Sequence, residues 1–392
     1  MRRLALEYGV RQVKLCTSWL AVAVLVAGCG GPGSYPGASP SAKGASSPIS
    51  SPSASARASS TPSPGASPTA SPATSPVPLT GTFAVLSTPP SGDTYTVSIV
   101  AANGKVVGSA QPSSPTAVTC GDAAAAVLPL PISTSDDRAY YMDAQGVVRF
   151  MTVQGETGRA TTVPVGGGRR SMFAVSPDDQ RIAVVVSDFT SSGVSIRLYV
   201  EDLNGATNHV EIFTSTGAFG LWPIGWHGSD NLVVAKVPSC AQGGGPFCCG
   251  PLELHVVDPA TALRRYTLGG PDCVIAGAAS PAGVACEVTA GYTTLRKLGW
   301  TGGVLGTSSI NGAAPAFVSP DGQIVALVAG STTKFQGATK TLNMQACGWI
   351  DSTHVISGGD VQQQPRIGNV TTGAVVPVAV QGTCAGRLPG GL

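Results

Sequence analysis

The segment Phe173–Ala183 reads FAVSPDDQRIA, and the segment Phe317–Ala326 repeats it as FVSPDGQIVA. Each segment joins two short apolar runs through a turn, made by Ser176, Pro177 and Asp178 in one copy and by Ser319, Pro320, Asp321 and Gly322 in the other. Proline presets φ at the second turn position, serine and aspartate bond the local backbone, and glycine accepts a positive φ. Both segments therefore predict the same β-hairpin.

Weaker copies of this turn recur along the chain, in Ser135–Tyr140, Gly225–Val233, Ala279–Val284 and Gly348–Val355. Most intervals between the turns are about 40–50 residues, the length of a four-stranded propeller blade. A second polar turn follows later in several units, in Tyr199–Gly205, Val256–Thr261 and Ile367–Gly373. It predicts a third strand, a turn and an outer strand in the same unit.

Short runs rich in Val, Ile, Thr and Tyr fill the intervals, and the chain has 51 Gly and 31 Pro for turns between them. Strands are expected at Thr82–Leu86, Tyr95–Val100, Val147–Val153, Ile182–Val186, Val194–Val200, Leu232–Val237, Leu252–Val257, Ile324–Val328 and Ala374–Val380. Thr82–Gln111 has three such runs without the Ser-Pro-Asp turn and is expected to form one further blade. The sequence favours an all-β propeller of seven blades, with six or eight blades, or a pair of β-sandwiches, as alternatives.

These turns resemble those of the TolB-type β-propellers of exported bacterial proteins, and the resemblance covers most of Leu79–Gly382. It implies a β-propeller fold and a role in interactions between proteins of the cell envelope. Propellers commonly bind through loops at the mouth of the central channel.

The first residues form a leader for export. Arg2, Arg3, Arg11 and Lys14 precede an apolar run, Leu15–Val26, whose length suits a signal peptide and is too short to span a bilayer. The run closes on Val26-Ala27-Gly28-Cys29, which resembles the lipobox of bacterial lipoproteins and implies cleavage after residue 28 and lipidation of Cys29. The alternatives are an uncleaved anchor helix, an ordinary signal peptide with a chance cysteine, and twin-arginine export. The protein is expected to be anchored to the outer face of the bacterial cell membrane.

Residues 29–78 consist almost entirely of Ser, Pro, Ala, Gly and Thr, with Lys43 and Arg57 as the only charges. Such a segment has no apolar surface to bury, so we expect a disordered stalk of about 40 Å root-mean-square length between the lipid and a domain at residues 79–392.

Eight cysteines belong to that domain: Cys120, Cys240, Cys248, Cys249, Cys273, Cys286, Cys347 and Cys384. An even number in an exported domain favours disulfides. Cys273 and Cys286 flank a predicted turn and are the best single pair; Cys240 with Cys248 or Cys249 is the next. Cys120, Cys347 and Cys384 share the remaining pairings, and Cys384 is expected to fasten the C-terminal strand beside the first blade. Zinc binding near Cys240 is the alternative.

The sequence has no catalytic motif, and no metal or cofactor is expected. The glycine-rich segment Gly166–Arg170 lies between two strands with no helix, so a loop between blades is favoured over a phosphate site. His209, His227, His255 and His354, and the acid pairs Asp136-Asp137 and Asp178-Asp179, are expected to be structural. Trp226 and Trp349 occupy matching repeat positions, which favours core packing between blades over a sugar site.

Net charge is +2 with 11% charged residues and no basic patch, so neither nucleic acid nor electrostatic attraction of the domain to lipid is expected. The favoured function is binding of an envelope protein or small ligand at a propeller face. An extracytoplasmic lyase or glycosidase is the alternative.

Overall fold

The short apolar runs of the sequence become strands in a computed structural model of the protein. The model describes residues 83–88, 91–118, 128, 131–190, 193–205, 207–217, 219–238, 253–312, 314–360 and 362–385. Across these ranges the chain forms 28 β-strands and no helix, so the predicted all-β class is confirmed. The leader, Cys29, the Ser/Pro/Ala-rich segment, Cys120, Cys240, Cys248 and Cys249 lie outside the described residues.

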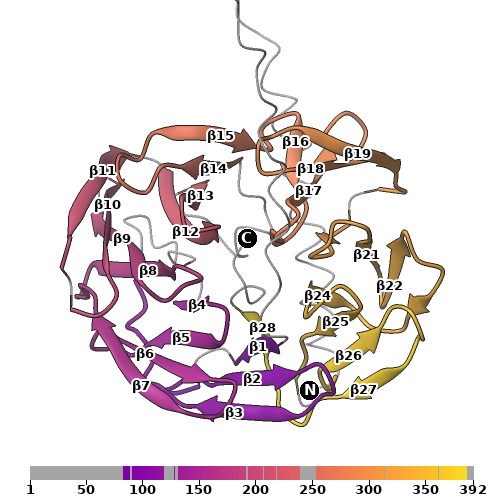
Figure 1. Cartoon of the computed structure of the whole chain (residues 1–392), viewed down its shortest axis with the longest axis horizontal. Helices are drawn as coiled ribbons and strands as arrows, with labels where there is room; N and C mark the ends of the chain where they lie inside the picture. The colour runs from indigo at the N-terminus through magenta and orange to yellow at the C-terminus, as the bar shows by residue number, and fades with distance from the viewer. Residues whose placement is uncertain are drawn as a thin grey trace, which may run out of the picture. The chain divides into compact units, whose positions relative to one another are not determined.

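The strands pair into seven antiparallel sheets of four strands, which form the blades of a ring (Figure 1). Blade 1 contains β28 (Thr383–Ala385), β1 (Phe83–Ser87), β2 (Val97–Ala101) and β3 (Val106–Ala110). Blade 2 contains β4 (Ile132–Thr134), β5 (Arg138–Met142), β6 (Val147–Thr152) and β7 (Thr157–Thr162). Blade 3 contains β8 (Arg169–Val175), β9 (Arg181–Thr190), β10 (Gly193–Asp202) and β11 (Val210–Gly217).

Blade 4 contains β12 (Phe219–His227), β13 (Asn231–Pro238), β14 (Glu253–Val257) and β15 (Arg264–Leu268). Blade 5 contains β16 (Cys273–Ile275), β17 (Val284–Val288), β18 (Thr294–Leu298) and β19 (Val304–Ser309). Blade 6 contains β20 (Ala316–Val318), β21 (Val325–Ala329), β22 (Thr332–Gln336) and β23 (Thr341–Leu342), and blade 7 contains β24 (Ala346–Trp349), β25 (His354–Ser357), β26 (Arg366–Asn369) and β27 (Val375–Pro377).

All six predicted Ser-Pro-Asp-type turns join the first strand of a blade to its second, and the three later turns join the third strand to the fourth. Antiparallel strands alternate in direction, so both kinds of turn lie at one end of the ring, which we call the turn face. The connections between second and third strands, and between blades, lie at the opposite end, which we call the loop face.

Blade 1 lacks a Ser-Pro-Asp turn because its first two strands come from opposite ends of the domain. β28 pairs with β1, with Cys384 opposite Leu86, and the two strands lie side by side in Figure 1. No turn connects these strands, since about 300 residues of chain separate them. The expectation that Thr82–Gln111 contributes a further blade is therefore confirmed, with the C-terminal strand completing it.

Seven blades is the number that the sequence favoured. The interval between the turns near residues 320 and 350 is short because blade 6 fits four short strands into Ala316–Leu342. A turn of two residues, Gly330 and Ser331, connects β21 to β22, and Gly330 has a φ of 60° there. Tight turns of this kind shorten a blade without removing a strand.

Trp226 and Trp349 lie between blades, as expected. Trp226 is fully buried and donates its indole N–H to the Ala174 carbonyl of blade 3 at 3.0 Å. Trp349 occupies the matching place in blade 7 and donates to the Phe317 carbonyl of blade 6 at 3.0 Å. Each indole fills the space between two sheets and also satisfies its polar atom.

Candidate functional site

The two close copies of the turn have the same hydrogen bonds. Ser176 donates its hydroxyl to Asp178 at 2.6 Å and accepts the Arg181 N–H at 2.9 Å. In the second copy, Ser319 and Asp321 are also 2.6 Å apart, and Ser319 accepts the Ile324 N–H at 2.9 Å. The predicted turn residues are thus occupied in holding the turn.

Asp179 and Gly322 hold the same place in the two copies, and both have a positive φ, 58° and 72°. This conformation is costly for a residue with a side chain. Asp179 uses its carboxylate to accept the Tyr140 hydroxyl at 2.7 Å and to pair with Arg138 at 3.2 Å, both from blade 2. The unfavourable backbone conformation of Asp179 therefore occurs where its side chain connects blade 3 to blade 2.

The four histidines lie in contacts within or between blades. His354 joins the two turns of blade 7, since its ring is 2.9 Å from Asp351 and 3.0 Å from Asn369. His227 stacks on Trp300 of blade 5 with 4.9 Å between ring centroids. His209 bonds the buried Glu201 at 2.7 Å. Their partners are structural groups of the described turns and strands.

The turn around Asp351 lowers the pKa of this carboxylate, which lies beside His354. Burial on its own would raise the pKa of Asp351, but hydrogen bonds from the Thr353 backbone and side chain and from His354 outweigh burial and hold this pKa below its usual value. The carboxylate stays ionised and fixes the turn.

A cavity of about 50 Å³ lies among the inner strands of blades 1, 5, 6 and 7. Small and apolar side chains dominate its lining, including Ala279, Val318 and Gly348. A space of this size holds one or a few water molecules. No charged side chain is among the described residues that line it, so it offers neither an acid–base pair nor room for a sugar.

A larger, open hollow of about 390 Å³ lies at the loop face of blade 3. Its floor is the connection Gly166–Gly168, which joins β7 to β8 and confirms the expected loop between blades. Arg169 at its edge pairs with Asp188 through two bonds of 2.5 and 3.1 Å. Because this carboxylate already neutralises the guanidinium, the hollow is poorly suited to an anion.

The connection that leaves blade 1 also reaches this face. Arg170 donates to the carbonyls of Pro115 and Thr116, and Ser113 bonds Gln145 of blade 2 at 3.3 Å. Burial lowers the pKa of the Arg170 guanidinium. The segment around Pro115 is therefore fixed across blade 2 to the inner strand of blade 3.

Blades 3 and 4 combine exposed aromatic rings with partly buried charged residues. Phe213 is 40% exposed and lies opposite Leu198, whose side chain packs between the two blades. Phe219 is 47% exposed, and the Lys236 ammonium lies 4.8 Å from its ring centroid. We call Phe213, Phe219 and the charged residues Lys236, Glu253 and His255 the blade 3–4 junction.

The charged residues of the junction lie on neighbouring strands of blade 4. Glu253 lies 3.1 Å from Lys236 and 3.2 Å from His255. Burial lowers the pKa of His255, and Glu253 opposes this only in part. The sequence analysis missed this site, because its residues are far apart in the chain.

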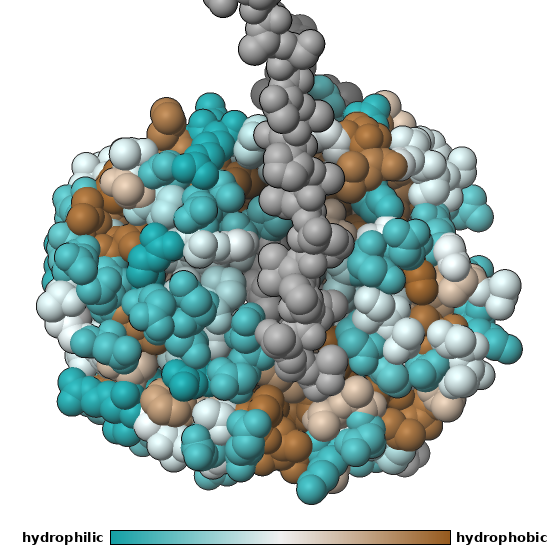
Figure 2. Space-filling model, viewed as in Figure 1, coloured by the Kyte–Doolittle hydropathy of each residue, from teal (hydrophilic) through white to brown (hydrophobic). Residues whose placement is uncertain are grey.

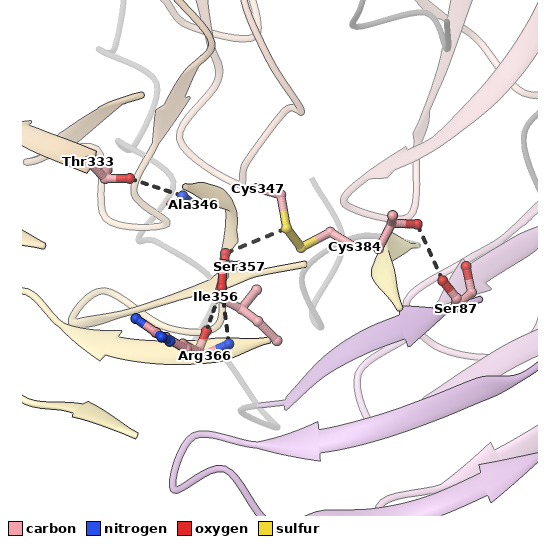
Figure 3. Close-up of a disulfide and its surroundings, with 9 residues drawn as sticks. Ser87, Thr333, Ala346, Cys347, Ile356, Ser357, Arg366 and Cys384 are labelled. Atoms are coloured by element: carbon pink, nitrogen blue, oxygen red, sulfur yellow. Dashed lines mark hydrogen bonds between the residues drawn. A yellow bond between two sulfur atoms is a disulfide. The ribbon is translucent and has the colours of Figure 1, made fainter. Parts of the chain in front are cut away.

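Two disulfides join described cysteines. Cys273 on β16 and Cys286 on β17 are bonded diagonally across the strand pair, with Cys273 opposite Val288 and Cys286 opposite Ile275. Their Cα atoms are 5.3 Å apart, and the predicted pair is confirmed. Cys347 and Cys384 have Cα atoms 5.9 Å apart and link blade 7 to the C-terminal strand of blade 1 (Figure 3). Thr383 beside Cys384 donates to the Ser87 carbonyl at 3.3 Å, so the expected fastening of the C-terminal strand is confirmed.

The disulfides indicate folding in an oxidising, extracytoplasmic compartment. Within the described ranges there is no helix, and hence none with the length and apolar character needed to cross a membrane. Those ranges also contain no group of three or more His, Cys, Asp and Glu placed to hold a metal ion.

No protein-family model matches the chain, and no curated protein matches it in sequence. Several solved structures are similar in fold. A chain of the mitotic checkpoint complex shares 13% identity at a TM-score of 0.43, over 67% of this chain and 81% of that one. Dihydro-heme d1 dehydrogenase NirN shares 12% at 0.40, over 79% of this chain and 66% of that one.

The apo form of prolyl oligopeptidase B from Galerina marginata shares 11% identity at a TM-score of 0.38, over 70% of this chain. The matched region spans only 43% of the oligopeptidase. Similarities at this level carry no argument about activity, so the strand pairing itself is the basis for the propeller fold.

Proposed function

We propose that this protein is an exported lipoprotein, attached through Cys29, whose TolB-like propeller binds a protein of the cell envelope at the blade 3–4 junction. The observation that carries the proposal is the exposed ring of Phe219 beside the charged cluster of Lys236, Glu253 and His255, with a second exposed ring, Phe213, on the outer strand of blade 3. Aromatic anchors beside a polar rim are typical of protein interfaces.

The strands around the junction support a recognition role. β9 and β10 have ten residues each and β12 has nine, whereas the strands of blade 7 have three or four. The surplus length extends these strands beyond those of blade 7, and the exposed Phe219 begins the long strand β12. A partner protein suits an exposed, partly aromatic surface better than a small ligand does.

The test places a photo-crosslinking amino acid at position 219 in the full chain in its native envelope. We expect one dominant adduct, lost when Phe213→Ser is added. The same crosslinker at position 376, on the outer strand of blade 7, is the matched control, because Val376 is 37% exposed. Equal adducts from both positions, or an adduct unaffected by Phe213→Ser, would contradict binding at the junction.

The lipid anchor has its own test. Cys29→Ala should abolish labelling by a fatty-acid analogue and leave the chain uncleaved or released, because only the cysteine sulfur can form the thioether. Labelling of the variant would overturn the anchor. Limited proteolysis should remove residues 30–78 and leave a core beginning near Leu79, and protection of this segment would contradict the stalk.

A further inference from the structure

The two disulfides between described cysteines lie in different surroundings. Cys273 is 8% exposed and Cys286 is fully buried, and both belong to the regular ladder of β16 and β17. Cys347 and Cys384 are half-buried, and both line the cavity of about 50 Å³ among blades 1, 5, 6 and 7. Solvent therefore has better access to the second pair than to the first.

A β-bulge sets Cys347 apart from the regular ladder of blade 7. The register between β24 and β25 shifts between Ala346 and Gly348, so Cys347 is the extra residue and has no partner on β25. Bulges re-aim a side chain, and this one reaches Cys384 on β28 (Figure 3). The bond therefore joins two blades at an irregular point of the ladder, whereas the other disulfide stays within one blade.

Apart from the disulfide, few contacts hold β28. The strand pairs with β1 over three residues, and Thr383 donates its hydroxyl to the Ser87 carbonyl at 3.3 Å. Gly382, just before the strand, exchanges two backbone bonds of 2.8 and 2.9 Å with Gly359. Thr383 is exposed and Ala385 is half-buried. A short strand with so little buried surface opens at a low cost in free energy unless a covalent bond holds it.

We propose that Cys347–Cys384 is a site of thiol–disulfide exchange with an external dithiol, and that its reduction releases β28 and opens the ring at blade 1. A thiolate of the dithiol attacks one sulfur of the pair, a mixed disulfide forms, and the other cysteine leaves as a thiolate that takes up a proton. The second thiol of the dithiol then resolves the mixed disulfide. The protein pair gains two electrons and two protons, and the dithiol is oxidised to a disulfide.

The surroundings suit both the attack and the reduced product. No charged side chain is among the described residues that line the cavity, so no anionic group there repels an incoming thiolate. The Cys347 sulfur lies 3.5 Å from the Ile356 carbonyl oxygen (Figure 3). A disulfide sulfur has no hydrogen to donate, whereas a thiol can donate to this carbonyl. Reduced Cys347 therefore has a hydrogen-bond partner already in place.

Release of β28 would change the surface of blade 1. All five residues of β1 are buried, and β28 pairs with the edge of β1 that faces the centre of the ring. On the face drawn in Figure 2, hydrophobic residues occur in small groups among hydrophilic ones. An uncovered β1 would add an apolar strand edge with unpaired backbone groups, which can pair with another extended strand. The exchange thus controls access to an edge that the oxidised ring keeps covered.

The test uses the full chain, purified without reductant and treated with dithiothreitol for increasing times under native conditions. Excess N-ethylmaleimide stops each sample, and peptide mapping reports each cysteine separately. We expect Cys347 and Cys384 to be alkylated at least about tenfold faster than Cys273 and Cys286, because exchange needs access to the sulfur. Amide hydrogen exchange should then become faster in β1 and stay unchanged in blade 5.

A variant at Gly348 tests the role of the cavity. Gly348 lines the cavity beside Cys347, and nothing lies within 4 Å of its added Cβ. Gly348→Leu should fill this space and slow reduction of the pair by about threefold or more, because access to the sulfur falls. Gly167→Leu in blade 3 is the matched control, since its added Cβ also has nothing within 4 Å, and it should be reduced like the wild type. Circular dichroism checks that each variant is folded.

Four outcomes overturn the proposal. They are reduction of Cys347–Cys384 no faster than that of Cys273–Cys286, reduction only after denaturation, selective reduction with unchanged hydrogen exchange in β1, and an unchanged rate in folded Gly348→Leu. This inference goes beyond the proposed binding function and does not depend on it. Neither the fatty-acid labelling of Cys29 nor crosslinking from position 219 enters these measurements, so failure here leaves the proposed function standing.

Discussion

Blades 3 and 4 hold together in a different way from blades 7 and 1. A single apolar cluster runs from blade 3 through blade 4 to blade 5 and includes Trp226 and Leu198. Between blades 7 and 1 the cluster is smaller, the strands are short, and a disulfide joins Cys347 to Cys384. Where strands are too short to bury enough apolar surface, the covalent link supplies the missing constraint.

The largest effect is expected from removing the apolar contact between blades 3 and 4. Trp226→Ala should lower the free energy of unfolding by about 3–5 kcal/mol, because it empties a fully buried site between blades 3 and 4. Urea denaturation measures the change. Trp226→Phe keeps part of the apolar contact but loses the hydrogen bond to the Ala174 carbonyl. The lost bond should lower the free energy of unfolding by about 1 kcal/mol, in addition to the cost of the smaller side chain. A loss below about 1 kcal/mol for Trp226→Ala would contradict the comparison.

The second way is to remove the covalent links one at a time. Cys347→Ala/Cys384→Ala should lower stability by about 4 kcal/mol, and Cys273→Ala/Cys286→Ala by about 3 kcal/mol. The order follows from loop length, since the two pairs are separated by 37 and 13 residues. Denaturation under non-reducing conditions checks it. A larger loss for the shorter loop would mean that ring closure does not depend on Cys384.

The repeated turn tests whether the two regions obey the same local rules. Gly322→Ala should lower stability by about 1 kcal/mol, because φ is 72° there and an added Cβ would lie 3.0 Å from the Ala282 side chain. Gly167→Ala is the control, since nothing lies within 4 Å of its added Cβ. Thermal unfolding should separate the two, and equal melting temperatures would refute the strain at Gly322.

The smallest expected effect is the pH dependence of stability, which should differ between blade 4, with His255, and blade 7, with Asp351. The pKa of His255 is lowered by burial, so the unfolded chain binds more protons below the ordinary histidine pKa of about 6.5, and stability should fall as pH drops through that value. His255→Gln should reduce this fall. The lowered pKa of Asp351 predicts that blade 7 loses its contribution only below about pH 4. Denaturation at about pH 7.5 and 5.5 gives the measurement, and an unchanged slope in the variant would refute it.

Local chemistry made much of the fold predictable. Ser176 and Asp178 are near neighbours whose hydrogen bonds are formed inside one turn, and the same letters at Ser319 and Asp321 produce the same bonds. The Cys273–Cys286 pair was also accessible, because a turn between two predicted strands brings its flanking residues onto neighbouring strands, where these two cysteines are diagonal neighbours. The partner of Cys347 was not, since ring closure brings in Cys384 from another blade.

The sequence by itself determined the repeating hairpin, the favoured number of blades and the buried places of Trp226 and Trp349, because these depend on short-range turn geometry and on strand alternation. Only the tertiary structure decided which side chains gather at the surface. Lys236 lies against the Phe219 ring on a neighbouring strand, and Arg181 of blade 3 lies over the Trp226 ring of blade 4. These contacts depend on the order of strands and blades around the ring. A repeat specifies each blade separately, whereas a surface between blades exists only once the ring has closed.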